Sequence, residues 1–507
     1  MTDPTLVADA RTEKAASVAE PTSRDLDALD RSMLSGLAWT GAAKWGVQVL
    51  SWASTIFVVR LLTPTDYGIV GMAAAFLTLL QPLSDFGIAA AVVQDRTLSR
   101  QQITRLSGFA ALLGCVWSLA TVGAAYPLAN FFNEPALITV VPLMGLGFVF
   151  GALRIVPGAM LVREMRFRVL AMIETAEALT VLTVTVGLAL LGRGYWALIL
   201  GSLSGRVVGA VLALVAQPIR MTPPTDIARL ARNLRFGAWV AASSVAWYAY
   251  TNADRVVVGR LIGEAALGVY SIAVTLASLP VEKISQLYLR VTEAVIAEVQ
   301  NDRPAVARYL VNITEAVAIL AFPLGVGLAL VADLFVVVVL GDRWASAIVP
   351  MRLLAVASAL RALDPLLAQV LVSTGHARDN ARSMVLATAV LPIAFLVSVK
   401  MSWGLAGVAW VWIIGHPLVV ISSQLWSVLR IAETSLARYA RALGPAIVCT
   451  TIMAIAVVGV RELPLDDAPA PAWLAASVAT GIIAYAAALM TLYPQRLRTA
   501  WELVKRR

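Results

Sequence analysis

Long apolar segments recur along nearly the whole chain and are separated by short polar connections. Each segment runs for about 18 or more residues, the length that an α-helix needs to cross the hydrocarbon part of a bilayer. The pattern predicts an all-α polytopic membrane protein with about fourteen transmembrane helices. These helices are expected at residues 35–60, 67–92, 106–127, 135–154, 168–190, 195–217, 236–259, 268–290, 309–331, 349–372, 384–400, 405–429, 442–460 and 471–493.

Composition agrees with lipid as the solvent. Of the 507 residues, 59% are hydrophobic and 14% are charged, whereas soluble domains carry roughly 25% charged residues. A chain this apolar cannot cover its surface with polar groups in water. The two cysteines, Cys115 and Cys449, lie inside apolar segments and indicate neither a disulfide nor a metal site. The two histidines, His376 and His416, are too few and too far apart to indicate a metal cluster.

The basic residues give the orientation, because cytoplasmic loops of membrane proteins carry an excess of Lys and Arg. With the N-terminal tail in the cytoplasm, most of the 40 basic residues fall in inward segments such as "QDRTLSR", "LVREMRFR" and "TGHARDNAR". Both termini are then cytoplasmic, as an even number of spans requires. Membrane topology accounts for the net charge of +9, so no nucleic-acid partner is expected.

One stretch of the sequence is written twice. "VVRLLTPTDYGIVG" begins at residue 58 and "VGRLIGEAALGVYS" at residue 258, so that Arg60 and Gly68 recur as Arg260 and Gly268. A second similarity relates "EPALITVVPLMGL" to "RWASAIVPMRLLA". Six predicted spans separate the copies, so both run in the same direction and the halves form parallel repeats. Chance similarity between apolar helices is the alternative.

The turn inside the repeat has the residues of a helix N-cap. Thr63 is a predicted helix N-cap, followed by Pro64 where no N–H is needed and by Asp66 near the positive helix end. Gly263 and Glu264 are expected to do similar work in the second copy. The motif is therefore interpreted as structural, setting a tight hairpin on the outer side.

The predicted organisation is two parallel six-helix lobes with an extra C-terminal helix pair. The expected parts are a disordered cytoplasmic tail (1–34), an N-lobe (35–217), a cytoplasmic linker (218–235), a C-lobe (236–430), the extra helix pair (442–493) and a basic cytoplasmic tail (494–507). Two such lobes are a transporter architecture, with the substrate site between them near the bilayer midplane.

Several stretches resemble a known family. "VVRLLTPTDYGIVGMAAAF", "LSDFGIAAAVVQ", "LGDRWASAIVPMRLLAVASAL" and "VLVSTGHARDNAR" are similar to Wzx-type, WzxC-like polysaccharide flippases of the multidrug/oligosaccharidyl-lipid/polysaccharide exporter superfamily. The similarity covers roughly residues 35–430 and rests on helix-end signatures. It implies a flippase of the bacterial inner membrane that carries a polyprenyl-diphosphate-linked oligosaccharide to the periplasmic leaflet for exopolysaccharide, capsule or O-antigen assembly. Polysaccharide polymerase or export machinery is then the candidate protein partner.

An anionic lipid diphosphate needs a wet, cationic passage, so intramembrane basic residues are the first candidates. A charge at the bilayer centre costs about 2.5–3.5 kcal/mol on insertion scales, so a charged residue at this depth usually has a function. The predicted substrate-binding residues are Lys44, Arg206, Lys283 and Arg361, with Trp45, Gln48, Trp52, Tyr248 and Asn252 on the first and seventh helices, which line the cavity in this superfamily. Two alternatives stay open: Lys44 snorkels to an interface, or Arg361 and Asp364 neutralise each other at i,i+3.

Intramembrane acids are the candidates for coupling transport to a proton or sodium gradient. The intramembrane acids are Asp85, Glu174, Glu177, Glu315 and Asp364, and Asp85, Glu174 and Glu177 are the predicted coupling residues. Asp85 is the foremost, because Pro82 precedes it and a proline kink can open the backbone. The alternative for each is a static ion pair with a basic residue of a neighbouring helix.

Other function classes fit less well. An ion-coupled multidrug or cation antiporter of the sister family has the same architecture, but that family favours acidic cavities and typically twelve spans. A membrane polymerase or glycosyltransferase generally carries a large outer loop, and the predicted outer loops are short. No GxxxxGK[ST] motif occurs, so neither ATP hydrolysis nor a cofactor is expected. The chain is predicted not to be an enzyme.

Overall fold

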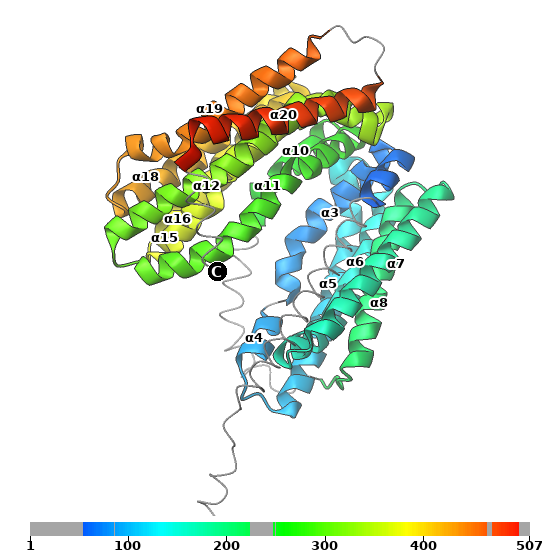
Figure 1. Ribbon diagram of the computed structural model, residues 1–507. Helices are drawn as coiled ribbons and strands as arrows, with labels where there is room; N and C mark the ends of the chain where they lie inside the picture. The colour runs from blue at the N-terminus through cyan, green and yellow to red at the C-terminus, as the bar shows by residue number, and fades with distance from the viewer. Residues whose placement is uncertain (1–53, 86, 224–246, 249, 464–468, 496–507) are drawn as a thin grey trace, which may run out of the picture.

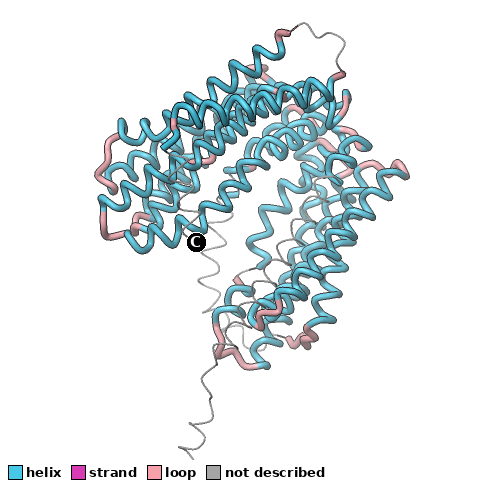
Figure 2. The backbone as a smooth tube through the Cα atoms, viewed as in Figure 1, coloured by secondary structure: helices cyan, strands magenta, loops and turns pink. Residues whose placement is uncertain are grey.

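The computed structural model describes residues 54–85, 87–223, 247–248, 250–463 and 469–495, and the regular structure within them is helical throughout (Figures 1 and 2). The longer helices are α3 (Pro64–Asp85), α5 (Arg100–Phe132), α6 (Leu137–Arg163), α7 (Phe167–Leu190), α8 (Tyr195–Ala216), α11 (Glu264–Val299), α12 (Arg303–Leu330), α14 (Ile348–Arg361), α15 (Asp364–Ser373), α16 (Ala377–Lys400), α18 (Ser422–Ile431), α19 (Leu436–Arg461) and α20 (Ala470–Leu492). The shorter ones are α4 (Ile88–Gln94), α10 (Ala253–Leu261), α13 (Ala332–Phe335), η1 (Val336–Leu340), η2 (Asp342–Ala347), α17 (Gly404–Trp410), η3 (Val411–Gly415) and η4 (Pro417–Ile421). The predicted all-α membrane fold is confirmed.

Within the described residues, 11 helical segments are long and apolar enough to cross a membrane, or up to 12 if the bent pair Ser54–Leu61 and Pro64–Gln81 counts as one span. Most of the expected first span and half of the expected seventh span lie outside the described residues. The count of fourteen therefore stays a prediction.

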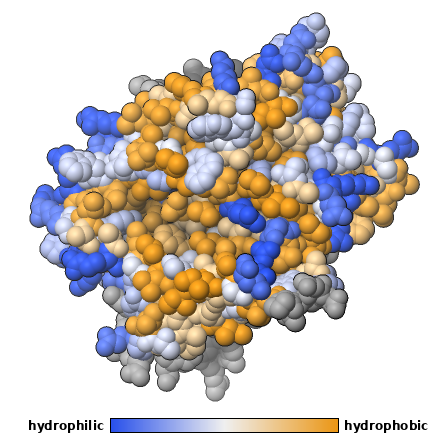
Figure 3. Space-filling view, turned by 90° about the horizontal axis from the view of Figure 1, so that it is seen from above, coloured by the Kyte–Doolittle hydropathy of each residue, from blue (hydrophilic) through white to orange (hydrophobic). Residues whose placement is uncertain are grey.

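The surface is that of a protein in contact with lipid. Large side chains such as Leu119, Val215 and Ile482 are mostly exposed. Figure 3, seen from above the view of Figure 1, shows broad hydrophobic areas interrupted by separate hydrophilic patches. Water would not tolerate apolar area on this scale, whereas the hydrocarbon region of a bilayer solvates it.

The helices form two groups that meet at one end and diverge toward the other (Figure 1). We call α3–α8 the N-lobe and α10–α18 the C-lobe; α3 of the first packs against α11 of the second. The extra pair packs on α12: the Tyr485 hydroxyl on α20 donates to the Ile319 carbonyl at 2.6 Å. The predicted linker, residues 218–235, lies mostly outside the described residues, and so do most of the two predicted tails.

Three differences between the predicted spans and the observed helices bear on the candidate site. The span expected at 135–154 continues as α6 to Arg163, because the apolar stretch after Arg154 is helical and no loop begins there. The span expected at 67–92 is divided into α3 and α4, with Gly87 at a φ of 71° before α4.

The third difference is the span expected at 349–372, which is broken at residues 362–363 between α14 and α15. Pro365 explains the break, because it has no N–H to donate to the carbonyl of Arg361 four residues earlier. The Tyr288 hydroxyl donates to the neighbouring Ala362 carbonyl at 2.7 Å and so supports the irregular turn.

Candidate functional site

The two copies of the repeat touch each other. Gly68 on α3 lies so close to the first residue of α11 that a Cβ on it would overlap the Glu264 carbonyl. Gly268 on α11 lies equally close to the Pro64 carbonyl at the start of α3. Residues 64 and 68 correspond to 264 and 268 in the repeat, so the contact is reciprocal, as in a symmetric dimer interface. Glycine at both positions lets the two backbones approach.

The duplicated arginines reach across the same contact. Arg60 donates from Nε to the Val339 carbonyl at 2.8 Å and from Nη2 to the Val338 carbonyl. The Arg260 guanidinium lies 5.6 Å from the centre of the Phe131 ring. Each arginine therefore extends from its own half of the chain to the other. Val339, which Arg60 contacts, lies just before "RWASAIVPMRLLA", and Phe131, which Arg260 contacts, lies just before "EPALITVVPLMGL".

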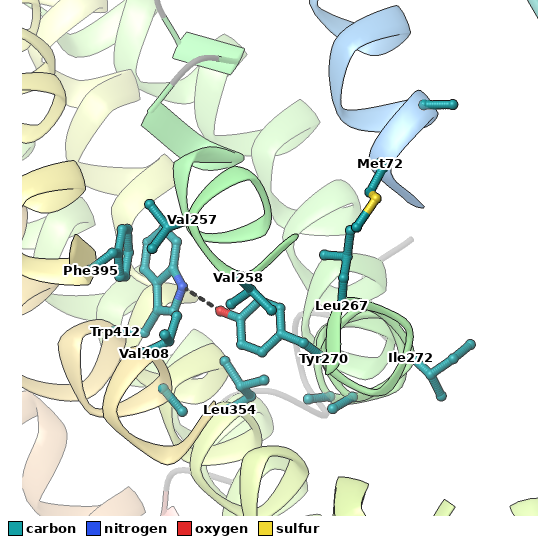
Figure 4. Close-up of a cluster of buried hydrophobic side chains, with 14 of the residues drawn as sticks. Met72, Val257, Val258, Leu267, Tyr270, Ile272, Leu354, Phe395, Val408 and Trp412 are labelled. Carbon is teal, nitrogen blue, oxygen red and sulfur yellow. Dashed lines mark hydrogen bonds between the residues drawn. The ribbon is translucent and has the colours of Figure 1, made fainter. Parts of the chain in front are cut away.

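Aromatic and apolar side chains fill the same region. Trp344 is fully buried, donates from Nε1 to the Val59 carbonyl at 3.0 Å, and packs edge-on against the Tyr67 ring at 5.6 Å between centroids. Met72 of α3 points toward Leu267 of α11 (Figure 4). We call this region the crossing, defined by Arg60, Gly68, Arg260, Gly268 and Trp344.

The predicted cap of the first copy is confirmed. The Asp66 N–H donates to the Thr63 hydroxyl at 3.3 Å, and the Thr63 N–H donates to the Asp66 carboxylate at 2.9 Å. The other carboxylate oxygen of Asp66 accepts from the Tyr195 N–H at 2.8 Å. In the second copy Gly263 is the N-cap, with a φ of 110° and no side-chain cap bond. The repeat sets a helix start, as predicted, and in addition joins the lobes.

Four of the predicted cavity residues lie outside the described residues: Lys44, Trp45, Gln48 and Trp52. Of the seventh-helix pair, Asn252 is nearly buried and donates to the Tyr248 carbonyl at 3.0 Å, while its Oδ1 accepts from Arg255 at 2.6 Å. Tyr248 is half-buried beside Trp247. Contact of these residues with cargo stays a prediction.

Arg206 packs inside the N-lobe. It is half-buried on α8 against Gly147 of α6, where a Cβ would collide with its guanidinium. Glu177 on α7 forms an ion pair with Arg154, the partner that the static alternative requires. Glu174 is half-buried one turn earlier on the same helix. The binding role of Arg206 and the coupling role of the two glutamates stay predictions.

Arg154 was missed by the sequence reasoning, because the helix was expected to end there. It lines a cavity of about 560 Å³ together with Gln94 and mainly small or apolar residues of α4, α6 and α7. The signal was the apolar stretch "IVPGAML" that follows it, which is too long for a connecting turn. Lys283 is half-buried on α11. Asp85 ends α3, and its side chain lies outside what the structure describes.

Arg361 lies in a polar group inside the C-lobe. Its guanidinium sits 4.1 Å from the centre of the Trp412 ring, a cation–π arrangement. Among the described residues no ion pair joins Arg361 to Asp364; the Asp364 carboxylate instead lies 3.1 Å from Nε2 of His416. His416 lies mid-helix in an expected span, which by itself makes an ionisable residue a functional candidate, but sequence reasoning considered it only as a metal ligand.

Trp412 also joins this group to the N-terminal part of the C-lobe. Its Nε1 donates to Asp254 at 2.9 Å. The same Nε1 donates to the Tyr270 hydroxyl at 3.1 Å (Figure 4). The Tyr270 hydroxyl in turn donates to Asp254 at 2.7 Å. All three side chains are almost completely buried. Arg206 packs within the N-lobe and Arg361 within the C-lobe, the lobes in which the sequence places them, and a passage lined by both stays a prediction.

Known proteins resemble this chain over most of its length. The chain is 26% identical over 410 residues to the lipopolysaccharide biosynthesis protein WzxC of Escherichia coli K12, covering 79% of this chain and 80% of that protein. It is 25% identical to the teichuronic acid biosynthesis protein TuaB of Bacillus subtilis 168, covering 93% and 98%. It is 24% identical to the succinoglycan biosynthesis transport protein ExoT of Rhizobium meliloti 1021, covering 65% and 67%.

Solved structures share the fold. The lipid II flippase MurJ, in an inward closed conformation, matches with a TM-score of 0.72 at 12% identity, covering 91% of this chain and all of that one. An inward-facing multidrug resistance MATE family transporter of the MOP superfamily matches with a TM-score of 0.61 at 16% identity, covering 76% and 94%. A family model described as polysaccharide biosynthesis protein matches residues 57–349, more than half of the chain. The chain therefore belongs to this family of polysaccharide biosynthesis proteins.

Proposed function

We propose that this protein is a flippase that moves a polyprenyl-diphosphate-linked oligosaccharide from the cytoplasmic to the periplasmic leaflet of a bacterial inner membrane. The observation that carries the proposal is the crossing: two repeated halves meet reciprocally at one end and diverge toward the other. Alternating access requires two bodies that separate at one end while they close at the other. The protein acts by transport, and no catalytic step is needed.

The relatives support the cargo class. WzxC and TuaB are named for the biosynthesis of lipopolysaccharide and of teichuronic acid, and ExoT is named as a transport protein of succinoglycan biosynthesis. MurJ, which shares the fold, is a flippase for lipid II. A lipid-diphosphate-linked oligosaccharide is a cargo that fits both roles, because it is a building block for a polysaccharide and a glycolipid that must cross the membrane.

The orientation follows from the positions of the basic residues. Connections at the end away from the crossing hold Arg96, Arg166, Arg378 and Arg438, on or beside the loops that join successive helices. The positive-inside rule assigns that end to the cytoplasm. The crossing then closes the periplasmic end, and both termini are cytoplasmic.

A deletion strain tests the proposal. Without the flippase, we expect the lipid-linked oligosaccharide to accumulate in the cytoplasmic leaflet while its synthesis continues, and the wild-type gene to restore export. Normal delivery to the periplasmic leaflet in the deletion strain would contradict the proposal. The antiporter alternative instead predicts unchanged polysaccharide export and increased sensitivity to cationic drugs.

The charged candidates can be tested in the same strain. We propose that Lys44, Arg206, Lys283 and Arg361 bind the diphosphate during transport. An Arg206→Ala chain that inserts normally should lose most export, and Arg206→Lys should keep part of it because the charge remains. Full export by the inserted Arg206→Ala chain would remove Arg206 from the binding site.

A further inference from the structure

Two spans of the C-lobe lose regular α-helical geometry around the same side chains. The span that contains α14 and α15 is broken at residues 362–363, and the span from α17 to α18 passes through the π-helical segments η3 and η4, which flank His416. Discontinuous membrane helices commonly form ion sites, and π-helical turns are frequent at functional positions. The region where the α14–α15 break lies beside η3 and η4 is therefore a candidate site for a small ion.

The side chains at this point are buried and incompletely paired. His416 has no exposed surface, and its Nε2 lies 3.1 Å from Asp364 Oδ2 without the alignment of a hydrogen bond. Nδ1 of His416, Oδ1 of Asp364 and Nε of Arg361 have no hydrogen-bond partner among the described residues. Native proteins pair almost all such buried atoms, so an open position on both the imidazole and the carboxylate is unusual.

The charges that face His416 come from several helices. Arg361 lies at the end of α14 and Asp364 at the start of α15, while α16 carries no ionisable side chain between residues 383 and 399. Beyond Trp412 lie Asp254 of α10 and Tyr270 of α11. Three further titratable side chains interact electrostatically with Asp364: Tyr250, Tyr288 and Tyr439. The Asp364 side chain is 17% exposed, so Asp364 is the member of the pair that reaches the protein surface.

We propose that His416 and Asp364 form a proton-binding pair that couples glycolipid movement to a proton gradient. The inference rests on the proposed function and names its coupling ion. On one side a proton enters at the partly exposed Asp364 carboxylate and passes to the adjacent Nε2 of His416, which makes an imidazolium beside the carboxylate. After the lobes have moved, the imidazolium returns the proton through Asp364 to the other side, so that the net change is the transfer of one proton.

A continuous set of contacts joins this pair to the crossing. Trp412 lies four residues before His416 and hydrogen-bonds to Asp254 and Tyr270. Tyr270 is two residues after Gly268 on α11 (Figure 4), and α10, which carries Asp254, includes Arg260. A change of charge at His416 thus acts on the two helices that hold the lobes together. Trp412 is the positioning residue in this path.

Transport by purified protein in liposomes tests the inference. With polyprenyl-diphosphate-linked oligosaccharide in the membrane and one proton exchanged per cargo molecule, each unit of pH difference should change the final distribution between leaflets about tenfold. His416→Gln should still move cargo without a gradient and should no longer respond to one. His376→Gln is the matched control, because the other histidine is exposed at the turn before α16, and it should respond as wild type does.

A second readout follows the lobes without cargo. Spin labels at Arg168→Cys on α7 and Arg382→Cys on α16, both exposed near the ends away from the crossing, report how far the lobes separate after the native cysteines are replaced. The distance distribution should shift between pH 8 and pH 6 in wild type and in His376→Gln, and should not shift in His416→Gln. If His416→Gln does not insert, Asp364→Asn takes its place with the same expectation.

The outcomes separate the two claims. Wild-type protein that moves the glycolipid with no response to pH difference overturns proton coupling and leaves the flippase intact. A His416→Gln chain that follows the gradient as wild type does assigns the proton to another group and also overturns the inference. Wild-type protein that moves no glycolipid under any gradient instead contradicts the proposed function.

Discussion

Gly68 and Gly268 show how much depends on single atoms in this protein. At each position a side chain would occupy the space of a carbonyl oxygen from the other lobe. Backbone atoms at the start of a helix cannot move aside as a flexible side chain can. The two lobes can therefore meet in this arrangement only while both residues are glycine.

Alanine at either glycine should disfavour the closed crossing. Overpacking of this kind costs about 1–3 kcal/mol, and about 1.4 kcal/mol lowers the ratio of molecules with the lobes in contact to molecules with the lobes apart about tenfold. With the spin labels on residues 168 and 382, Gly68→Ala or Gly268→Ala should shift the distance distribution away from the wild-type one.

Gly71→Ala is the matched control on the same helix. A Cβ there would lie 3.5 Å from side-chain atoms of Leu267 and Ser271, an ordinary van der Waals distance. Its distance distribution should equal that of wild type. If Gly71→Ala and Gly68→Ala behave alike, close backbone approach is not what holds the crossing together.

Trp344→Phe tests the polar part of the crossing. The variant keeps an aromatic ring against Tyr67 and removes the hydrogen bond from Nε1 to the Val59 carbonyl. Losing it should cost about 1 kcal/mol of stability, seen as a lower Tm of the purified protein. Trp403→Phe, at a position 56% exposed, should change stability by less than about 0.5 kcal/mol, and an equal loss in both variants would argue against the bond.

Local chemistry could be predicted at the residue scale, and long-range contacts could not. The cap formed by Thr63 and Asp66 follows from three neighbouring positions, so the sequence was enough. The contact of Gly68 with Glu264 joins residues two hundred positions apart, and a repeat alone does not say that its copies touch. The pairing of His416 with Asp364 depends on the fold in the same way.

At the scale of elements, breaks in helices are more informative than their lengths. The expected span at 349–372 is interrupted because Pro365 leaves the Arg361 carbonyl without its helical partner. The proline was visible in the sequence, but hydropathy alone favoured a continuous helix. The π-helical segments around His416 carry a similar signal, because Pro417 at the start of η4 has no N–H to donate to the Ile413 carbonyl four residues earlier.

The attachment of the extra helix pair gives a pH prediction. Arg461 at the end of α19 donates to the Leu330 carbonyl at 2.7 Å and forms an ion pair with Asp333, which lies between two spans. Partial burial alone would raise the pKa of Asp333, but hydrogen bonds and the charge of Arg461 outweigh it and hold the pKa below the usual 3.8. The folded state thus binds this proton less readily than the unfolded chain does.

It follows that the contribution of Asp333 to stability is complete above about pH 3.8 and is lost only as the pH falls below that value. Between pH 5 and 8 the attachment should not respond to pH. Asp333→Asn should instead make α19 and α20 easier to cleave by protease at neutral pH. Asp342→Asn, an exposed carboxylate nearby, should not, and equal cleavage of both variants would show that the ion pair does not hold the helices.

At the scale of the whole molecule, the two-lobe architecture could be predicted because lipid imposes strong constraints on sequence. Apolar length predicts the spans, so the all-α fold with its parallel repeat could be predicted, and the direction that the basic loops indicate stays a prediction. The contacts of the polar groups inside each lobe could not be predicted in this way: the packing of Arg206 against Gly147 and of Arg361 against the Trp412 ring depends on the fold. Charged residues in predicted spans indicate where functional side chains lie along the chain, but the sequence does not show which neighbouring helix each of them contacts.

The most direct test of the account is leaflet transfer by the purified protein. Liposomes containing polyprenyl-diphosphate-linked oligosaccharide are probed from outside with a lectin that cannot cross the membrane. Wild-type protein should make the inner-leaflet glycolipid accessible with time, Gly71→Ala should do the same, and the double variant Gly68→Ala/Gly268→Ala should be much slower. Transfer by the double variant at the wild-type rate, or no transfer by wild type, would contradict a flippase that works through the crossing of its two repeats.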